Sequence, residues 1–145
     1  MAVHGLGLAE LERSFGRTRE LCRQLGDPSE LFPILSGLAM YHHGRAETQS
    51  MQVLSEQLVA PTEQKDDSAH LLQAHVVQGA CCRNLRRLVK GREHCERGLA
   101  LYDPAVHRTL ADQYGFDPGV VSGLCLQRVL WLLGYPDQAV KQANK

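Results

Sequence analysis

The side chains of this chain that could hold a metal ion are histidines and cysteines, which occur in three groups. The groups are His42-His43, His70 with His75, and the run Glu93-His94-Cys95-Glu96. Zinc sites usually contain ligand pairs such as Cys-x-x-Cys or His-x-x-x-His, because those spacings bring both side chains to one ion. His70 and His75 are five residues apart, which separates them by about 140° around a helix at roughly 100° per residue. We therefore expect no metal site and no cofactor.

Cysteine catalysis is also weakly supported by the spacing. A cysteine nucleophile needs a base within reach and a lowered thiol pKa. His94 directly precedes Cys95, but neighbouring residues on a helix diverge by about 100°. Three cysteines are instead interpreted as small buried apolar groups: Cys22, Cys81 and Cys125. The chain is not expected to be an enzyme, and a cysteine- or metal-dependent hydrolase is the least favoured alternative.

The one concentrated charge run in the sequence is basic. Its members are Arg83, Arg86, Arg87, Lys90 and Arg92. Such a patch could bind an acidic peptide or a phosphate, and it could contact nucleic acid, although no aromatic residue is interleaved for stacking on bases. The alternative, which we favour, is a solvated turn between two helices. Over the whole chain, 16 basic and 16 acidic residues give no net charge, so we expect neither a nucleic-acid nor a membrane partner.

Four rings lie in a segment, residues 102–119, that is otherwise rich in polar residues. They belong to Tyr102, His107, Tyr114 and Phe116. Loops held on a rigid scaffold often carry binding function, so these side chains are candidates for an interaction surface. They could equally fill the gap that a long linker leaves between helical hairpins, and the residues leave both interpretations open. Trp131, in a run of leucines, is predicted to lie in the core.

The elements that position these residues are predicted to be helices throughout. Abundant Leu, Ala, Gln, Glu and Arg favour helix over strand. Three Asp-Pro pairs mark helix starts, and they are Asp27-Pro28, Asp103-Pro104 and Asp117-Pro118. Apolar residues recur at steps of three, four and seven. The pattern predicts helices over 8–25, 28–43, 46–60, 67–84, 88–102, 117–133 and 136–144, with a short irregular or helical piece over 104–114 and no strand.

Short connections between long helices favour antiparallel hairpins, and these hairpins repeat. We expect the turns between helices at Gly44, Arg86 and Gly134, which lie 42 and 48 residues apart. Gly91 follows Arg86 by five residues, and Gly98 lies seven further on. Small residues at this spacing should let the second helix of a hairpin approach the first closely.

Three stretches resemble a known family: residues 99–104 (LALYDP), 117–120 (DPGV) and 131–139 (WLLGYPDQA). They are similar to the tetratricopeptide-like tails of large bacterial signalling proteins, which join an ATPase module, and often an adenylate or guanylate cyclase or a kinase, to helical repeats. Residues 10–13 (ELER) and 19–27 (RELCRQLGD) extend the similarity upstream. The resemblance implies a regulatory or scaffolding repeat, because the chain contains no phosphate loop. Two departures are Gln49, where a small residue is usual, and Arg86 in place of a turn glycine.

Together these features predict an all-α domain over residues 1–145. We expect tetratricopeptide-like antiparallel hairpins stacked as a short right-handed solenoid, with incomplete hairpins at both ends and an insertion at about 102–119. Uncapped solenoid ends expose apolar surface, which favours a homodimer.

The expected function is a non-catalytic protein–protein interaction or scaffold module of a bacterial signalling system, which binds a peptide or helix of a protein partner. The alternative is a ligand-sensing regulatory module for a separate nucleotide-using enzyme, with its ligand pocket beside the segment 102–119. The longest apolar-rich stretch, residues 120–133, is too short to span a bilayer, and the odd set of five cysteines does not suggest a secreted disulfide framework. We therefore expect a cytoplasmic protein.

Overall fold

The computed structural model describes residues 31–62 and 68–145, together with scattered residues between 10 and 24. Within these ranges the chain is all-helical and contains no strand, which confirms the all-α part of the predicted fold. The helices are α2 (Leu31–Gly44), α3 (Thr48–Thr62), α4 (Ser68–Asn84), α5 (Leu88–Leu101), α6 (Pro104–His107), α7 (Leu110–Tyr114), α8 (Pro118–Leu132) and α9 (Pro136–Ala143). The helix predicted over 8–25, with Cys22 and the Asp27-Pro28 pair, falls outside the continuously described residues.

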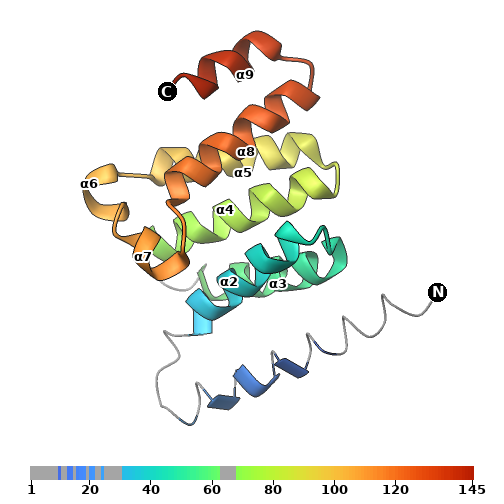
Figure 1. Cartoon of the computed structure of the whole chain (residues 1–145), viewed down its shortest axis with the longest axis vertical. Coiled ribbons are helices and arrows are strands. Elements are labelled where there is room, and N and C mark those ends of the chain that lie inside the picture. Colours follow the sequence, from blue (N-terminus) through green and yellow to red (C-terminus); the bar gives the residue numbers. More distant parts are fainter. Residues whose placement is uncertain are drawn as a thin grey trace, which may run out of the picture.

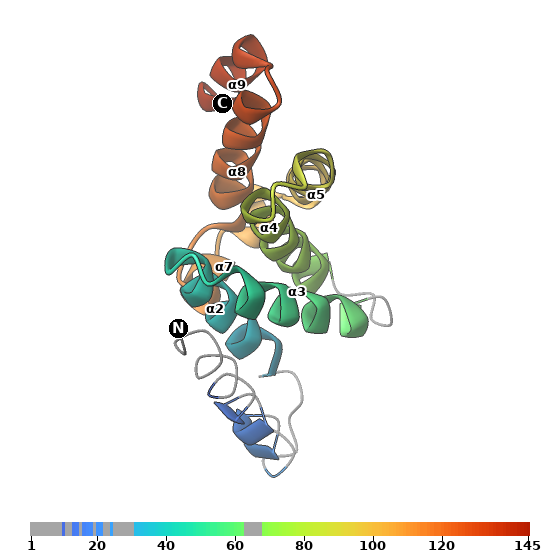
Figure 2. The same ribbon diagram turned by 90° about the vertical axis from the view of Figure 1, so that its right-hand side faces the viewer.

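Six of the described helices form three antiparallel hairpins, which pair α2 with α3, α4 with α5, and α8 with α9. The hairpins follow one another along the longest axis of the molecule (Figure 1). In the perpendicular view, the α4–α5 hairpin lies between the other two (Figure 2). Its helix α4 packs against α2 and α3 on one side and α8 on the other, and α5 packs against α8. The middle hairpin therefore joins the first to the third.

The three hairpin turns share one backbone geometry. Each has a residue with positive φ, namely Ala46 (φ 56°), Arg86 (φ 58°) and Gly134 (φ 84°). In the first turn the Ala46 N–H donates to the carbonyl of His43 at 3.1 Å, and the Glu47 N–H donates to that of His42 at 3.0 Å. The same pair of bonds recurs in the other two turns. This is the Schellman motif, in which a left-handed residue ends the helix and satisfies its last carbonyls.

The first turn lies two residues later than the sequence indicated. We expected Gly44 to take the left-handed position, but Gly44 is still helical as the last residue of α2, and Ala46 takes that position. The helical hydrogen bonding continues past the glycine, because the Arg45 N–H still donates to the Tyr41 carbonyl at 3.3 Å. The residue five positions after the turn is consequently the buried Met51 rather than Gln49.

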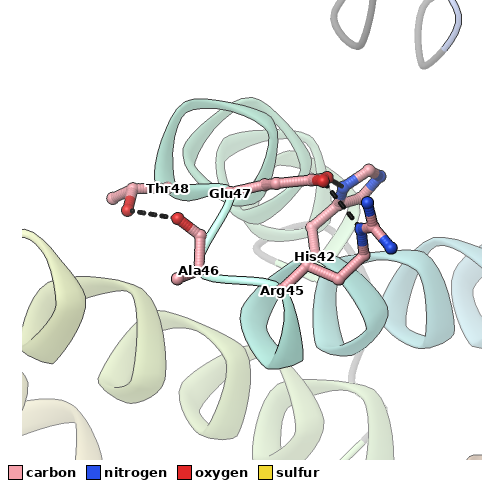
Figure 3. Close-up of polar contacts among 5 residues, drawn as sticks. All are labelled: His42, Arg45, Ala46, Glu47 and Thr48. Carbon is pink, nitrogen blue, oxygen red and sulfur yellow. Dashed lines mark hydrogen bonds and ion pairs between the residues drawn. The ribbon is translucent and has the colours of Figure 1, made fainter. Parts of the chain in front are cut away.

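Side chains stabilise this first turn where no glycine is present (Figure 3). The Glu47 carboxylate contacts Nδ1 of His42 and accepts a 2.7 Å hydrogen bond from Nε of Arg45. These bonds, that from Arg45 first, lower the pKa of the Glu47 carboxyl group. The Thr48 hydroxyl donates to the Ala46 carbonyl at 3.3 Å. The contacts connect the end of α2 to the start of α3 around a residue type that disfavours the left-handed conformation.

The apolar interior forms two clusters. The first core consists of Phe32, Leu35, Ala39, Met51, Leu54, Leu58, Ala74, Val77, Ala80, Cys81 and Tyr114. The second core consists of Cys95, Cys125, Leu126, Val129, Leu130 and Ala139. Helix α5 packs against both α4 and α8 and buries only small residues: Gly91, Cys95 and Gly98. A Cβ at Gly91 would make an ordinary 3.5 Å contact with Cys82 Cβ on α4, whereas one at Gly98 would lie 2.9 Å from Oγ of Ser122 on α8, so the tightest approach is to the next hairpin rather than within this one.

The segment between α5 and α8 folds as two short helices and packs inward. Asp117 caps α8 by accepting hydrogen bonds from the backbone N–H groups of Gly119 (2.8 Å) and Val120 (3.2 Å), as its Asp-Pro pair predicted. The Tyr102 hydroxyl donates to the same carboxylate at 2.8 Å. Tyr114 belongs to the first core, and Phe116 packs against it. The rings of this segment therefore fill the space beside the hairpins.

Candidate functional site

A pocket of about 570 Å³ opens at the junction of the second and third hairpins. One wall comes from the end of α4 and the turn into α5, and the other from the last two turns of α8. The lining residues are Arg83, Asn84, Arg86, Leu88, Gln127, Arg128, Trp131 and Leu132. The pocket thus combines three guanidinium groups with an aromatic ring, aliphatic side chains and two amides.

The positive charge in this pocket is not neutralised within the described part of the chain. Among those residues, no ion pair joins Arg83, Arg86 or Arg128 to a carboxylate; the ion pairs there involve other side chains. Arg83 instead points an amino group at Nε2 of His43, 3.1 Å away. Burial, followed by the charges of Arg83 and Arg128, lowers the pKa of His43. The imidazole is therefore neutral at neutral pH and adds no compensating charge.

The side chains of His43, Arg83 and Asn84 contain more hydrogen-bond donors than they can satisfy among themselves. Nδ2 of Asn84 lies 3.0 Å from Nδ1 of His43, and Oδ1 of Asn84 lies 3.3 Å from the Arg83 amino group. A neutral imidazole accepts on only one nitrogen. In either orientation of the Asn84 amide, and with either imidazole tautomer, one donor therefore faces another donor. A carboxylate or phosphate oxygen entering the pocket would supply the missing acceptor.

Trp131 forms part of the pocket wall, and its prediction as a core residue was wrong. The residue is 62% exposed, and the adjacent Leu132 is 54% exposed. The buried face of α8 consists of residues such as Cys125, Val129 and Leu130, and Trp131 lies about 100° around the helix from Leu130. The apolar run concealed this change of face, because leucines occur on both sides of it.

Two members of the predicted basic run line the pocket, and three do not. Arg83 and Arg86 line it, and Arg86 is the left-handed residue of the turn between α4 and α5. Arg87 and Lys90 are exposed outside the pocket lining. Arg92 forms a 2.7 Å ion pair with Glu96 one turn later on α5. The pocket arginine that the sequence analysis missed, Arg128, lies more than 40 residues from Arg83, and no local pattern connects them.

The four rings of residues 102–119 do not contribute to this pocket. His107 and Tyr114 are only 5% and 7% exposed, so their prediction as interaction-surface residues was wrong. Nδ1 of His107 accepts a 2.9 Å hydrogen bond from the Asp103 N–H. Tyr102 and Phe116 are half-buried. Packing, the second of the two interpretations left open by the sequence, describes where these side chains lie.

The histidines and cysteines are dispersed or buried. His70 packs against the Phe32 ring, with centroids 4.2 Å apart. His75 and His94 meet across α4 and α5 with their Nδ1 atoms 3.0 Å apart, a pair that their 19-residue separation concealed. Burial, then the charges of His94 and Arg97, lowers the pKa of His75 to about 4. Within the described residues, no three potential ligands converge on a metal position.

The cysteines at positions 81, 82, 95 and 125 are all buried and unpaired. This confirms the prediction for Cys81 and Cys125 as small buried groups. Cys22 lies outside the described residues.

Comparisons with protein-family models, curated proteins and solved structures found no match. The resemblance to tetratricopeptide-like tails therefore stays a prediction that rests on the stretches quoted above. No helix in residues 31–62 or 68–145 is both long and apolar enough to cross a membrane.

Proposed function

We propose that this chain is a tetratricopeptide-like interaction module, without catalytic activity, that binds a segment of a partner protein in a bacterial signalling system. The three hairpins of the described residues support this proposal, because they repeat one turn geometry along a single axis. Stacked helical hairpins present extended surfaces that suit peptide binding. In this proposal the stack is a right-handed solenoid and the module acts in the cytoplasm. Homodimer formation is part of it, and analytical ultracentrifugation tests that part directly.

The observation that carries the proposal is the pocket at the junction of the second and third hairpins. It places three guanidinium groups without carboxylate partners in the described chain beside an exposed tryptophan. The complementary segment is acidic and carries an apolar side chain that packs on Trp131 and Leu132. A hydrogen bond to a charged group contributes about 1.5–3 kcal/mol, so two or three such contacts contribute about 3–9 kcal/mol. A micromolar complex needs roughly 8 kcal/mol, and the apolar contact with Trp131 and Leu132 supplies the remainder.

A second candidate function is supported by the size of the pocket. A volume of about 570 Å³ lies within the range of about 300–1,000 Å³ that is typical of small-molecule sites. In this alternative, the chain senses a small anionic ligand and regulates a separate nucleotide-using enzyme. The pocket at the junction of the second and third hairpins, rather than the segment 102–119, would then be the sensing site.

Trp131 is the sole tryptophan of the chain, so its fluorescence reports directly on the pocket. The protein is titrated with a synthetic peptide that alternates glutamate and leucine, and with a matched lysine–leucine peptide. We expect the acidic peptide to shift the emission and the basic peptide to leave it unchanged. A shift produced by inorganic phosphate or free glutamate at submillimolar concentration would favour the ligand-sensing alternative.

Arg128→Glu tests the role of the pocket, and Arg87→Glu is the matched control because it makes the same charge change outside the lining. Loss of about 1.5–3 kcal/mol of interaction corresponds to a tenfold or larger loss of affinity. We expect this loss for Arg128→Glu and only a small one for Arg87→Glu. Equal losses for the two variants, or equal binding of both peptides, would contradict the proposed site.

A further inference from the structure

Helices α5 and α8 pack closely in an antiparallel arrangement. A Cβ at Gly98 on α5 would lie 2.9 Å from Oγ of Ser122 on α8, so these two residues mark a point of close approach. Cys95 lies three residues before Gly98, and Cys125 lies three residues after Ser122. Because the helices run in opposite directions, both cysteines lie about one turn from that point on the same side. The register therefore places the two cysteines opposite each other.

The two cysteines belong to one buried apolar cluster, and their residues are 1% and 5% exposed. Their mutual interaction raises the pKa of the Cys95 thiol and lowers that of the Cys125 thiol. Gly79 on α4 provides space for the Cys95 side chain, since a Cβ there would fall 2.8 Å from its sulfur. A disulfide needs backbones that approach to a Cα–Cα distance of about 4.4–6.8 Å. The absence of a side chain at Gly98 permits such an approach.

We propose that Cys95 and Cys125 form a modification site, in which a two-electron oxidant such as hydrogen peroxide converts the thiol pair into a disulfide. The disulfide joins the second hairpin to the third. It needs no second copy of the chain, because both sulfur atoms already lie inside one molecule.

The reaction proceeds in two balanced steps. The Cys125 sulfur attacks one oxygen of the peroxide, the O–O bond breaks, and the departing hydroxide takes up the thiol proton to form water. The Cys95 sulfur then attacks the sulfur of the Cys125 sulfenic acid, and the S–O bond breaks. The departing hydroxide takes the Cys95 proton, so two thiols and one peroxide give one disulfide and two waters.

Local chemistry favours Cys125 as the attacking group. Interaction with Cys95 lowers the pKa of the Cys125 thiol, whereas burial raises those of Cys81 and Cys82. Thiolate is the reactive form, so Cys125 should react before the two cysteines on α4. Because both members of the pair are buried, the rate follows local opening of the α5–α8 contact.

The disulfide would have a consequence for the pocket, which rests on the proposed function. Arg83, Arg86 and Leu88 form the wall on the second hairpin, and Arg128 and Trp131 form the wall on α8. Cys125 precedes Arg128 by about one helical turn. A bond between α5 and α8 would therefore hold the two walls at one spacing, and oxidation would change peptide affinity.

The experiment uses the full chain, treated with hydrogen peroxide in native buffer, alkylated, and digested with trypsin without reductant. Trypsin places Cys95 in the peptide 93–97 and Cys125 in 109–128, while Cys81 and Cys82 share the peptide 66–83. We expect mass spectrometry to find 93–97 joined to 109–128 as the dominant cross-link. Both peptides should also be lost from the alkylated fraction. A dominant cross-link from peptide 66–83 to peptide 93–97 or 109–128 would overturn the proposal. Complete alkylation of the cysteines in all three peptides would do so as well.

Two variants and one comparison complete the test. Cys125→Ser should abolish the link and Cys81→Ser should retain it; circular dichroism confirms that each variant is folded. Oxidation in urea should scatter the links over all cysteines, and the same scatter in native buffer would count against a structured site. The cross-link is detected without any peptide ligand. A failure of the proposed binding function therefore leaves this result intact, and fluorescence titration of the oxidised protein tests the coupling separately.

Discussion

Replacing Gly119 with alanine is expected to destabilise the protein, although alanine is the better helix former. Gly119 lies in the first turn of α8, and a Cβ there would lie 2.5, 2.6 and 2.7 Å from three ring carbons of Tyr102. The ring cannot move away freely, because its hydroxyl donates a 2.8 Å hydrogen bond to Asp117, which also caps α8. Either the ring leaves Asp117 or α8 shifts away from the end of α5.

The magnitude follows from three contributions. Forcing an extra methyl group into a packed site costs about 1–3 kcal/mol. If the ring swings aside instead, the lost hydrogen bond to a carboxylate costs about 1.5–3 kcal/mol. The higher helix propensity of alanine returns at most about 1 kcal/mol. We therefore expect the free energy of unfolding of Gly119→Ala to fall by about 1–2 kcal/mol.

Urea unfolding followed by far-ultraviolet circular dichroism measures this change, and Gly123→Ala is the matched control. Gly123 lies one turn further along α8, where a Cβ would make an ordinary 3.5 Å contact with Nε2 of Gln142. That variant should be stabilised by about 0.5–1 kcal/mol. A Gly119→Ala protein as stable as Gly123→Ala would refute the reasoning. In a Tyr102→Ala background the penalty at position 119 should vanish; a persistent penalty would show that the ring is not its cause.

Two further predictions concern the hairpin turns and the response to acid. A non-glycine residue in the left-handed region costs roughly 1–2 kcal/mol, and the greater conformational entropy that glycine loses on folding offsets about 0.5–1 kcal/mol of this. Ala46→Gly should therefore stabilise the protein slightly, and Gly134→Ala should destabilise it. Urea unfolding midpoints shifted in the opposite directions would be incompatible with the three turns being equivalent. Burial, then the charges of His94 and Arg97, lowers the pKa of His75 in the folded protein from 6.5 to about 4, so the unfolded chain binds the proton more readily. The contribution of the neutral His75 to the free energy of unfolding should be fully present above pH 6.5 and lost as the pH falls towards 4. His75→Gln should flatten this part of the stability profile measured by urea unfolding, and an unchanged slope would exclude His75 as its source.

Helix positions could be predicted from the sequence because the signals that set them are local. The helices begin and end within two residues of the predicted bounds wherever those residues are described. Asp103 and Asp117 accept hydrogen bonds from backbone N–H groups two residues later, so the caps depend only on their neighbours. The glycines of α5 were also informative, because a buried seven-residue spacing of small residues has few explanations other than close helix packing.

The pocket could not be predicted, because it depends on how separate hairpins are placed. Arg83 and Arg128 come together only when α8 packs against α4. The exposed face of Trp131 is set by the angle at which α8 meets its neighbours, and an apolar run does not encode that angle. The position of the turn at Ala46 was predicted wrongly for a different reason. The contacts of Glu47 with His42 and Arg45 let a residue other than glycine take the left-handed position after the helix.

The small side chains that α5 buries set how closely the next hairpin approaches it. Helix α8 packs against both α4 and α5, and a Cβ at Gly98 would lie 2.9 Å from Oγ of Ser122 on α8. A larger side chain at Cys95 or Gly98 would force successive hairpins apart. It would change the angle between them, and with it the width of the pocket. The size of two residues that do not line the pocket is therefore a means of adjusting which partner segments fit.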